Sequence, residues 1–309
     1  MTSGRGVVIC VITFRRPRQL QRVLEGIGQL EISRIDPRVE TLVVDNDADR
    51  SAEPVCKQAR RTLPWPLRYE VEPRQGIPFA RNKAVSCAQD GADFIAFIDD
   101  DGYPSPLWLE ELLHVQDRFA ADVVTGPQVR YVSEDAPRWL RCSGLLDTRR
   151  YPTGHRMDCA YTGNVLVRPE VFRQMKPVFD ERFGLSGGSD VHFFRRVHLA
   201  GYSIVWADQA VVKEWMPANR VTTKQILLRA YSIGNSTSLL EVELNRSLGT
   251  RLTVLSRALV YAAKAFVLLP LGLLVGKRGF VRALWHLYRA AGMLTGLVGH
   301  RFTFYRSHG

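Results

Sequence analysis

Three consecutive carboxylates follow an apolar run in the stretch FIAFIDDDGYP, which begins at Phe94. The run up to Ile98 is almost entirely apolar and aromatic, a pattern typical of a strand that is covered on both faces. Asp99, Asp100 and Asp101 then stand at the carboxyl end of this strand, where open α/β sheets bind their ligands. Adjacent carboxylates there predict a site for a hard divalent cation or for ligand hydroxyls. A solvated acidic turn is the alternative, because Asp and Gly are ordinary turn residues.

Three more loops carry chemical groups at the ends of predicted strands: TFRRP from Thr13, DNDADRS from Asp45, and GIPFARN around Arg81. Asp45 can accept a hydrogen bond from the N3–H of a pyrimidine, and Arg81 can pair with phosphate oxygens. Asp99 and Asp101, two residues apart, can share a ribose and a divalent ion that bridges a diphosphate. Because the carboxyl ends of parallel strands share one edge of a sheet, the four loops together predict a nucleotide diphosphate site.

Apolar runs alternate with helix-like segments along the first part of the chain. Strands are predicted at 7–13, 40–44, 67–72 and 94–98, with helices after Pro17, near Ser51, at 78–88 and at 105–119. Such alternation indicates βαβ units and a mostly parallel sheet, so we expect an α/β fold. Further along we expect one strand at 122–132, irregular chain from about 133 to 190, a helix that ends at Gly201, and strands at 203–206 and 210–213.

Composition and charge separate the chain into two parts. With 309 residues and 46% hydrophobic content, it is long and apolar enough for one large α/β domain with an appendage. The formal charge is +11, but the segment after Glu243 has ten cations and no acid, so the rest carries only +1. Cations interleaved with long apolar runs indicate a membrane surface with anionic lipids and not a nucleic acid. The five cysteines lack a CxxC spacing and predict reduced thiols, as in the cytosol.

Two apolar segments of this tail, 258–276 and 281–299, are each associated with one polar stripe at helical spacing. The stripes consist of Arg257, Tyr261 and Lys264 in the first and of Arg282, His286 and Arg289 in the second. A charge at the bilayer centre costs ~2.5–3.5 kcal/mol on insertion scales. We therefore expect both helices to lie in the interface, with their cations at the headgroups. The competing arrangement is a helical hairpin that spans the bilayer with the two charged stripes facing inward.

Taken in order, the motifs of this chain resemble those of a known family. They are VITFRRP, VVDNDADRS, GIPFARN, FIAFIDDDGYP, YTGNVLVR, GGSDVHFFRRVHLAGY and AVVKEW. The order is similar to that of the inverting family-two glycosyltransferases, most of all their bacterial exopolysaccharide branch of the succinoglycan-glucosyltransferase kind. The resemblance implies a GT-A catalytic domain at 1–225, with a Rossmann-like, mixed and mostly parallel sheet flanked by helices. A helical, basic, membrane-associating region would follow at 226–309.

The resemblance also implies roles for single residues. The nucleotide-sugar contacts fall on Thr13, Arg16, Asp45, Arg81, Asp99 and Lys213. Asp101, together with Asp99, is implied as the ligand of Mg²⁺ or Mn²⁺. Asn164 and Gly188 fall on the acceptor side. Asp100 points the other way along the chain, so we expect it to tolerate replacement by Asn far better than its neighbours do.

The GGSD segment places Asp190 on the position of the family's catalytic base. An inverting transfer needs one carboxylate that takes the proton of the acceptor hydroxyl while this oxygen attacks the anomeric carbon from behind. Ser189 departs from the usual Glu and removes a negative charge beside the base. A carboxylate that satisfies free N–H groups at the start of a helix is the alternative interpretation of Asp190.

Lys213 stands where related sequences usually have a His that completes the metal or diphosphate contact. A protonated lysine cannot ligate a cation, but it can pair directly with phosphate oxygens. A solvated surface lysine is the alternative interpretation.

The combined prediction is a metal-dependent hexosyltransferase of exopolysaccharide synthesis. It would move glucose from UDP-glucose onto a lipid-linked oligosaccharide, with inversion, at the cytoplasmic face of the bacterial inner membrane. The rival is a non-catalytic, membrane-bound nucleotide-sugar-binding or scaffold protein, because of the departures at Ser189 and Lys213.

Overall fold

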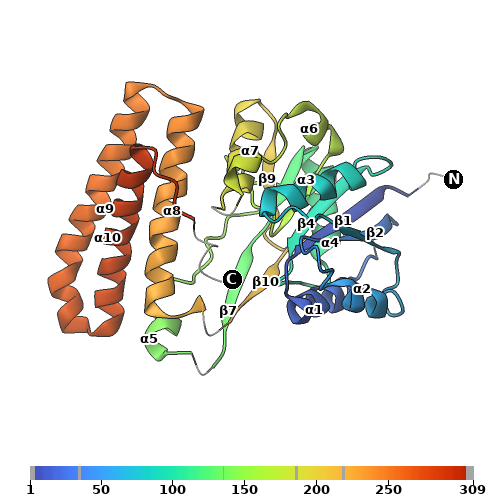
Figure 1. Cartoon of the computed structure of the whole chain (residues 1–309), viewed down its shortest axis with the longest axis horizontal. Coiled ribbons are helices and arrows are strands. Elements are labelled where there is room, and N and C mark those ends of the chain that lie inside the picture. The colour runs from blue at the N-terminus through green and yellow to red at the C-terminus, as the bar shows by residue number, and fades with distance from the viewer. Residues whose placement is uncertain (1–3, 34–35, 135, 185–186, 218–219, 304–309) are drawn as a thin grey trace. The chain divides into compact units, whose positions relative to one another are not determined.

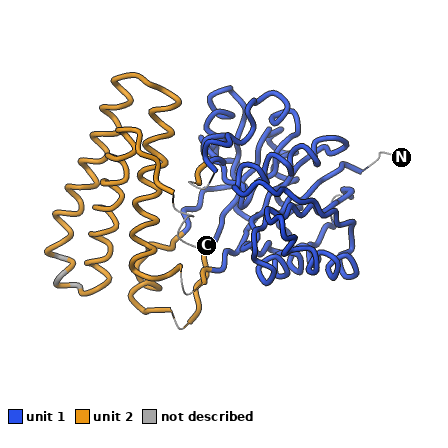
Figure 2. Tube along the Cα trace, in the orientation of Figure 1, with its two compact units in different colours: residues 1–129, 148–184, 189–215 blue, residues 130–147, 185–188, 216–309 orange. Residues whose placement is uncertain are grey.

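The computed structural model describes residues 4–33, 36–134, 136–184, 187–217 and 220–303. It divides into two compact units, which Figure 2 draws in different colours. Unit 1 comprises residues 1–129, 148–184 and 189–215, and unit 2 comprises residues 130–147, 185–188 and 216–309. Unit 2 thus includes two segments that precede the tail and that no change in composition marks.

Unit 1 is built on a seven-stranded sheet, which confirms the predicted α/β fold. Its strands are β1 (Gly6–Thr13), β2 (Arg38–Asp45), β3 (Leu67–Val71), β4 (Phe94–Asp99), β6 (Val123–Thr125), β8 (Val165–Val167) and β9 (Ile204–Trp206). The strand order is β3-β2-β1-β4-β8-β6-β9. The first four strands are parallel, and β8 runs antiparallel to both of its neighbours. The continuous apolar runs predicted the first four strands, because a strand with helices on both faces has no polar face.

Helices cover both faces of this sheet (Figure 1). One core contains residues from α1 (Pro17–Gly28), α2 (Glu53–Ala59) and α4 (Trp108–Phe119), and the other from α3 (Ile77–Ala88), α6 (Pro169–Gln174) and α7 (Ser189–Leu199). Alternate residues of β1 enter opposite cores, with Val7 and Ile9 in one and Val8 and Cys10 in the other. The sheet is thereby fixed from both sides, and its strand ends have defined positions.

Residues 122–132 form two short strands, so the prediction of one strand was wrong. β6 belongs to the large sheet, whereas β7 (Gln128–Val132) joins β5 (Gly102–Pro104) and β10 (Val212–Met216) in a three-stranded sheet. The chain turns at Gly126, where a Cβ would lie 2.5 Å from the carbonyl oxygen of Ala210. Only glycine allows so close a backbone approach, and this glycine marks the change of sheet.

The stretch from 133 to 190, which we expected to be irregular, contains β8 and α6. β8 lies between β4 and β6 and so completes the middle of the sheet. It has only three residues, too few for an apolar period to appear in the sequence. The helix predicted to end at Gly201 is confirmed as α7, and the two strands predicted after it are confirmed as β9 and β10.

Most of the described part of unit 2 is helical. It contains α5 (Arg138–Arg141), α8 (Thr223–Leu244), α9 (Leu248–Val275) and α10 (Lys277–Leu297), with α10 between α8 and α9 (Figure 1). A Cβ at Gly292 of α10 would lie 2.0 Å from the carbonyl oxygen of Tyr231 of α8, so the two backbones touch. Small residues that permit such contact are typical of helix pairs in membranes.

Parts of the polar stripes of α9 and α10 face each other. The Tyr261 ring stacks on the His286 imidazole with 5.7 Å between ring centroids, and the Arg289 guanidinium carbon lies 5.0 Å from the Tyr261 ring centroid. The outer surface of α9 is apolar and exposed, at Leu252, Leu259, Val260, Phe266 and Val267. Arg257, Lys264 and Arg282 are exposed, so only part of each stripe lies between the two helices. The interfacial arrangement and the spanning hairpin both stay predictions.

Candidate active site

The acidic triplet lies where the strand order changes direction. From β1 the chain builds outward to β2 and β3 on one side and then to β4 on the other. Thr13 at the end of β1 is in register with Asp45 at the end of β2, and Ile12 is in register with Asp99 at the end of β4. Strand ends at such a switch point frame the crevice in which α/β sheets bind ligands. The structure therefore brings three of the predicted residues to one sheet edge.

The side chain of Asp100 contacts the loop that follows β1. Its Oδ2 accepts a hydrogen bond from Thr13 Oγ1 at 2.9 Å, and its Oδ1 accepts one from Arg16 Nη1 at 3.0 Å. Burial raises the pKa of the Asp100 carboxyl to about 6, and the charge of Arg16 opposes this rise. These contacts argue against the prediction that Asp100 tolerates Asn far better than its neighbours do, because an Asn would lose the ion pair with Arg16. Arg16 Nη1 also lies 3.7 Å from Asp101 Oδ2, so this arginine forms ion pairs with two of the three acids.

Asp99 lies close to other carboxylates and to one arginine. Burial raises the pKa of its carboxyl to about 7, Arg81 opposes this rise, and the charges of Asp101 and Asp190 add to it. A Cβ at Gly163 would lie 2.8 Å from Asp99 Oδ2, so backbone closes one side of the carboxylate. A bound divalent cation would relieve the repulsion among such carboxylates, and their oxygens are the hard ligands that Mg²⁺ and Mn²⁺ take.

Arg81 of α3 connects the triplet with the start of α7. Its Nη1 donates to Ser189 Oγ at 2.9 Å, and its Nη2 lies 3.8 Å from Asp190 Oδ2. The guanidinium carbon lies 5.6 Å from the ring centroid of Phe179, and both Arg81 and Ser189 are buried. Asp190 Oδ1 accepts from the N–H of Val191 at 2.9 Å. One carboxylate oxygen thus contacts the helix start while the other faces Arg81.

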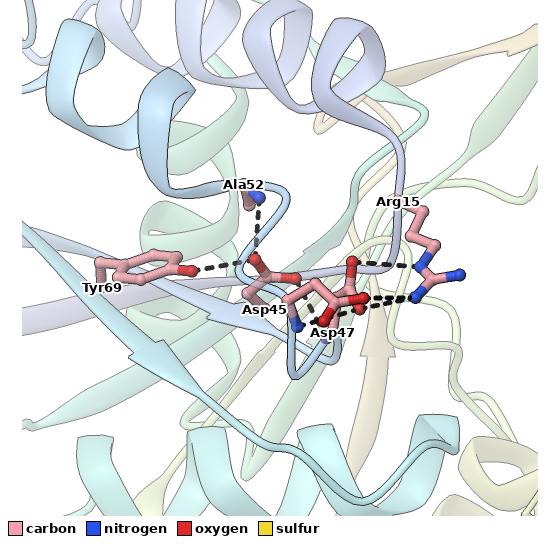
Figure 3. A network of polar contacts seen from close by, with 6 residues as sticks. Arg15, Asp45, Asp47, Ala52 and Tyr69 are labelled. Carbon is pink, nitrogen blue, oxygen red and sulfur yellow. Dashed lines mark hydrogen bonds and ion pairs between the residues drawn. The ribbon is translucent and has the colours of Figure 1, made fainter.

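Asp45 is the centre of a polar network at the end of β2 (Figure 3). Its Oδ2 accepts from the Ala52 N–H at 2.8 Å and from the Tyr69 hydroxyl at 2.9 Å, and its Oδ1 accepts from the Asp47 N–H at 3.1 Å. Burial and the bond to Asp45 raise the pKa of the Tyr69 hydroxyl. The carboxylate is fully buried and fixes the loop after β2. The contact of Asp45 with a nucleotide base stays a prediction. For this contact, either the hydrogen bonds of Asp45 must open, or the loop that Asp45 fixes must contact the base in its place.

Comparison with known proteins decides the family. Residues 8–179 match the family model described as glycosyl transferase family 2. The chain belongs to this family. It is 30% identical over 295 residues to the succinoglycan biosynthesis protein ExoM of Rhizobium meliloti, a match that covers 94% of this chain and 92% of that protein. It is 24% identical over 212 residues to the glycosyltransferase AglE of Haloferax volcanii, covering 68% of this chain and 67% of that one.

Solved glycosyltransferases share the fold. The mannosyltransferase PcManGT of Pyrobaculum calidifontis, in complex with GDP-Man and Mn²⁺, has a TM-score of 0.62 at 16% identity and covers 94% of this chain and 86% of that one. S. aureus TarS 1–349, in complex with UDP-GlcNAc, has a TM-score of 0.52 at 14% identity and covers 95% of this chain and 92% of that one. The predicted GT-A fold is thereby confirmed.

In this family-two glycosyltransferase, Lys213 lies on β10, next to the acidic triplet. The N–H of Trp215 donates to the carbonyl oxygen of Asp101 at 3.2 Å and ties β10 to the turn. Because side chains alternate along a strand, the exposed Lys213 and Trp215 share one face, and the half-buried Glu214 takes the other. The contact of Lys213 with a diphosphate stays a prediction.

The two predicted acceptor-side residues of the glycosyltransferase lie apart in the chain. Asn164 is buried, and its Oδ1 accepts from Trp108 Nε1 at 2.8 Å. Its Nδ2 donates to the carbonyl oxygens of Ala210 at 2.7 Å and Pro127 at 3.1 Å. Because the oxygen and the nitrogen of its side-chain amide are already hydrogen-bonded, Asn164 can affect an acceptor only through the position of the loop that it fixes. Gly188 precedes α7 with a φ of 89°, in the left-handed region that favours glycine.

Two features beside the candidate site were not predicted from the sequence. Arg15 Nε donates to Asp47 Oδ2 at 3.1 Å and its Nη2 to Asp49 Oδ2 at 2.9 Å, which joins the loops after β1 and β2 (Figure 3). The bond from Arg15 lowers the pKa of Asp47, and Arg15 itself has a φ of 52°, a strained value for a residue with a side chain. Gln128 lies over Gly163, where a Cβ would meet its Nε2 at 1.7 Å. The opposite charges of the loops after β1 and β2 could have indicated the contact of Arg15 with the acids. No local pattern in the sequence indicates that Gln128 lies over Gly163.

Proposed function

We propose that the chain is an inverting glycosyltransferase that moves glucose from UDP-glucose onto a lipid-linked oligosaccharide. One observation carries this proposal: Arg81 lies 3.8 Å from Asp190 and close enough to Asp99 to affect the pKa of its carboxyl. Three kinds of group thus lie together at one sheet edge: a cationic group for a diphosphate, acids for a divalent ion, and a carboxylate for the acceptor hydroxyl. Transfer requires these three groups to be held in one fixed arrangement.

A divalent cation, Mn²⁺ or Mg²⁺, is assigned to Asp99 and Asp101. Burial raises the pKa of Asp99, and the charges of Asp101 and Asp190 add to this rise. A bound cation would stabilise the charged carboxylates, which supports this assignment. When bound, the ion neutralises negative charge on the diphosphate that leaves. PcManGT, which has the same fold, is solved with Mn²⁺.

Asp190 is assigned as the base. It takes the proton from the acceptor hydroxyl while the hydroxyl oxygen attacks the anomeric carbon and the bond from that carbon to the nucleotide diphosphate breaks. Ser189 holds Arg81 by a hydrogen bond of 2.9 Å, and Arg81 in turn faces the carboxylate of Asp190. Although Ser replaces the usual Glu at position 189, Arg81 is therefore still held in place. This favours an enzyme over a scaffold protein.

The acceptor and the location follow from the relatives and from unit 2. The ExoM match, which extends over most of both chains, is named for succinoglycan biosynthesis. In the described chain, the segment Leu248–Pro270 of α9 is long and apolar enough to cross a membrane, with a mean hydropathy of 1.7. The free cysteines suit a reducing compartment. We therefore place the catalytic unit at the cytoplasmic face of the bacterial inner membrane, where it meets a lipid-linked glycan.

A panel of nucleotide sugars tests the proposal. Purified full-length protein should release UDP from UDP-glucose faster than from UDP-GlcNAc, and addition of Mn²⁺ or Mg²⁺ should increase the rate. The anomeric signal of the product should show a β-linkage made from the α-linked donor. A scaffold protein binds a nucleotide sugar and releases nothing, so the absence of release from every donor, with lipid extract present, would sink the proposal.

A further inference from the structure

A half-buried glutamine lies beside the acidic triplet. The side chain of Gln128, at the start of β7, covers Gly163 so closely that a Cβ on this glycine would lie 1.7 Å from Gln128 Nε2. The same Cβ would lie 2.8 Å from Asp99 Oδ2. The amide of Gln128 and the carboxylate of Asp99 therefore flank one point next to the glycine. They are close enough together for a single ligand hydroxyl to contact both.

No residue in the described part of the chain forms a hydrogen bond with the side-chain amide of Gln128. Its backbone carbonyl oxygen, in contrast, accepts a hydrogen bond from Thr148 Oγ1. The neighbouring amide of Asn164 is hydrogen-bonded through both its oxygen and its nitrogen. A primary amide has two N–H donors and one carbonyl acceptor, and unmatched groups of this kind in a partly buried site cost free energy. The amide of Gln128 can therefore gain hydrogen bonds when a ligand binds.

Hydrogen bonds between two loops fix the backbone around Gln128. Asn164 Nδ2 donates to the carbonyl oxygen of Pro127 at 3.1 Å, and Thr125 Oγ1 donates to the carbonyl oxygen of Asn164 at 2.8 Å. Thr125, Pro127 and Asn164 are all buried. A group that recognises a ligand must be held in position, because hydrogen bonds weaken steeply when they are misaligned. The fold supplies such a support for Gln128.

The strand order places Gln128 on the sugar side of the proposed donor. Thr13 and Asp45 end β1 and β2, on one side of β4, whereas Gly163 precedes β8, on the other side of β4. With the base near Asp45 and the diphosphate near Asp99, as predicted, the sugar of the donor extends towards β8 and Gln128. A glutamine is neutral and can both donate and accept hydrogen bonds, as the hydroxyl groups of a hexose do.

We propose that Gln128 selects the donor sugar through a hydrogen bond between its amide and one hydroxyl group of the hexose. This inference rests on the proposed function and deepens it, because it assigns a residue that distinguishes one nucleotide sugar from another. A neutral amide adds no charge for the diphosphate, so it contributes to binding where a hydroxyl group matches it. A sugar that lacks this hydroxyl, or directs it elsewhere, leaves the amide without a partner and is rejected.

Binding measurements with the full-length protein test this inference. Titration calorimetry gives the dissociation constants of UDP and of UDP-glucose for the wild type, for Gln128→Ala and for Gln128→Met, which keeps the length of the side chain. Both variants should bind UDP-glucose ~10-fold more weakly and UDP with an unchanged constant, since only the sugar loses a hydrogen bond. Gln58→Ala, at an exposed glutamine of α2, is the matched control and should change neither constant.

Analogues of UDP-glucose that each lack one hydroxyl of the hexose identify the contact. One analogue should bind ~10-fold more weakly than UDP-glucose to the wild type but equally well to Gln128→Ala, because the variant no longer makes the hydrogen bond. The same loss in both proteins for every analogue would overturn the inference. An equal loss of UDP and UDP-glucose in the variants would place the amide on the nucleotide and would also overturn it.

UDP release is measured in the same preparations, so that the two proposals can fail separately. Absence of release together with the expected changes in binding would defeat only the proposed function. Release by the wild type together with unchanged binding of UDP-glucose by Gln128→Ala would defeat only the assignment of Gln128.

Discussion

At the scale of single residues, the site concentrates carboxylates that are only partly neutralised. Burial raises the pKa of Asp99 to about 7 and that of Asp100 to about 6. Asp100 pairs with Arg16 at 3.0 Å, whereas Arg81 lies 3.8 Å from Asp190 and also affects the pKa of Asp99. The two acids therefore have different roles: Asp100 fixes the turn, and Asp99 is available to a ligand.

Asp190→Asn should lower the turnover number by ~10²–10⁴-fold, the usual contribution of a positioned base. The dissociation constant for UDP should change little, because the amide keeps the shape of the side chain. Steady-state kinetics and titration calorimetry measure the two quantities. Asp158→Asn is the control, since this acid is exposed and pairs with Arg195. A variant at position 190 with close to full turnover would remove the base assignment.

Asp101→Ala should weaken UDP binding much more with Mn²⁺ present than without it, because the lost carboxylate is a ligand of the ion. Calorimetric titrations of UDP in buffer with Mn²⁺ and with EDTA give the two losses. Asp49→Ala, at a side chain that is 81% exposed, should change neither. Equal losses under both conditions would show that Asp101 does not ligate the ion.

The raised pKa of Asp99 predicts a pH-dependent stability without cation. The folded protein keeps a proton on this carboxyl up to about pH 7, whereas an unperturbed carboxyl releases it near 3.8. The free energy of unfolding should therefore fall across this range as the pH rises, and then level off. Asp99→Asn should make the fall smaller and raise the free energy of unfolding above pH 7 by ~1 kcal/mol or more. Urea unfolding at several pH values measures this, and parallel curves for the two proteins would contradict it.

At the scale of elements, strand ends and the loops that cross them give the site its shape. The loop before β8 approaches Asp99 through Gly163, and β10 is hydrogen-bonded to the turn of the triplet through Trp215 and Asp101. These elements come from distant parts of the chain, so a change in one of them alters the position of the acids.

Gly163→Ala should lower catalytic efficiency ~10-fold or more, because the new methyl group would lie 2.8 Å from Asp99 Oδ2. The free energy of unfolding should fall by only ~1 kcal/mol, since the other close group is the flexible end of Gln128. Gly249→Ala is the control, because its nearest neighbour is 3.8 Å away. Unchanged kinetics in the Gly163 variant would show that the loop does not position Asp99.

At the scale of the whole molecule, one chain combines an α/β unit with a helical unit that exposes many apolar side chains on α9. In unit 1 the strands and helix faces bury their apolar residues. In unit 2 Tyr261 and His286 stack between α9 and α10, whereas leucine, valine and phenylalanine side chains of α9 are exposed. Such a surface is stable in contact with lipid and unstable in water.

Membrane extraction should therefore leave the protein in the membrane fraction after alkaline carbonate. α9 has 28 residues and a length of about 42 Å at 1.5 Å per residue, enough for a hydrocarbon core of about 30 Å. Replacing exposed Phe266 and Val267 by Lys should release part of the protein, whereas Lys replacement of exposed Leu199 in unit 1 should not. Full release of the wild-type protein by carbonate would favour the interfacial arrangement.

The sequence by itself determined the first four strands, the helices between them, the edge at which the acids lie and the family. These features depend on local patterns: an apolar run fixes a strand, and parallel strands direct their carboxyl ends to one edge. Motif order then identified the glycosyltransferase. Charge counting likewise separated the basic tail from the rest of the chain.

Only the tertiary structure decided which partner each polar group takes. Arg81 and Ser189 are 108 residues apart, and Thr13 and Asp100 are 87 apart, so no local pattern could pair them. Asn164 and Asp45, both predicted to contact substrate, satisfy buried groups within the fold, because a buried polar atom must find a partner there. The helical stripes of the tail were visible in the sequence, but whether they face lipid headgroups or each other depends on how two helices pack.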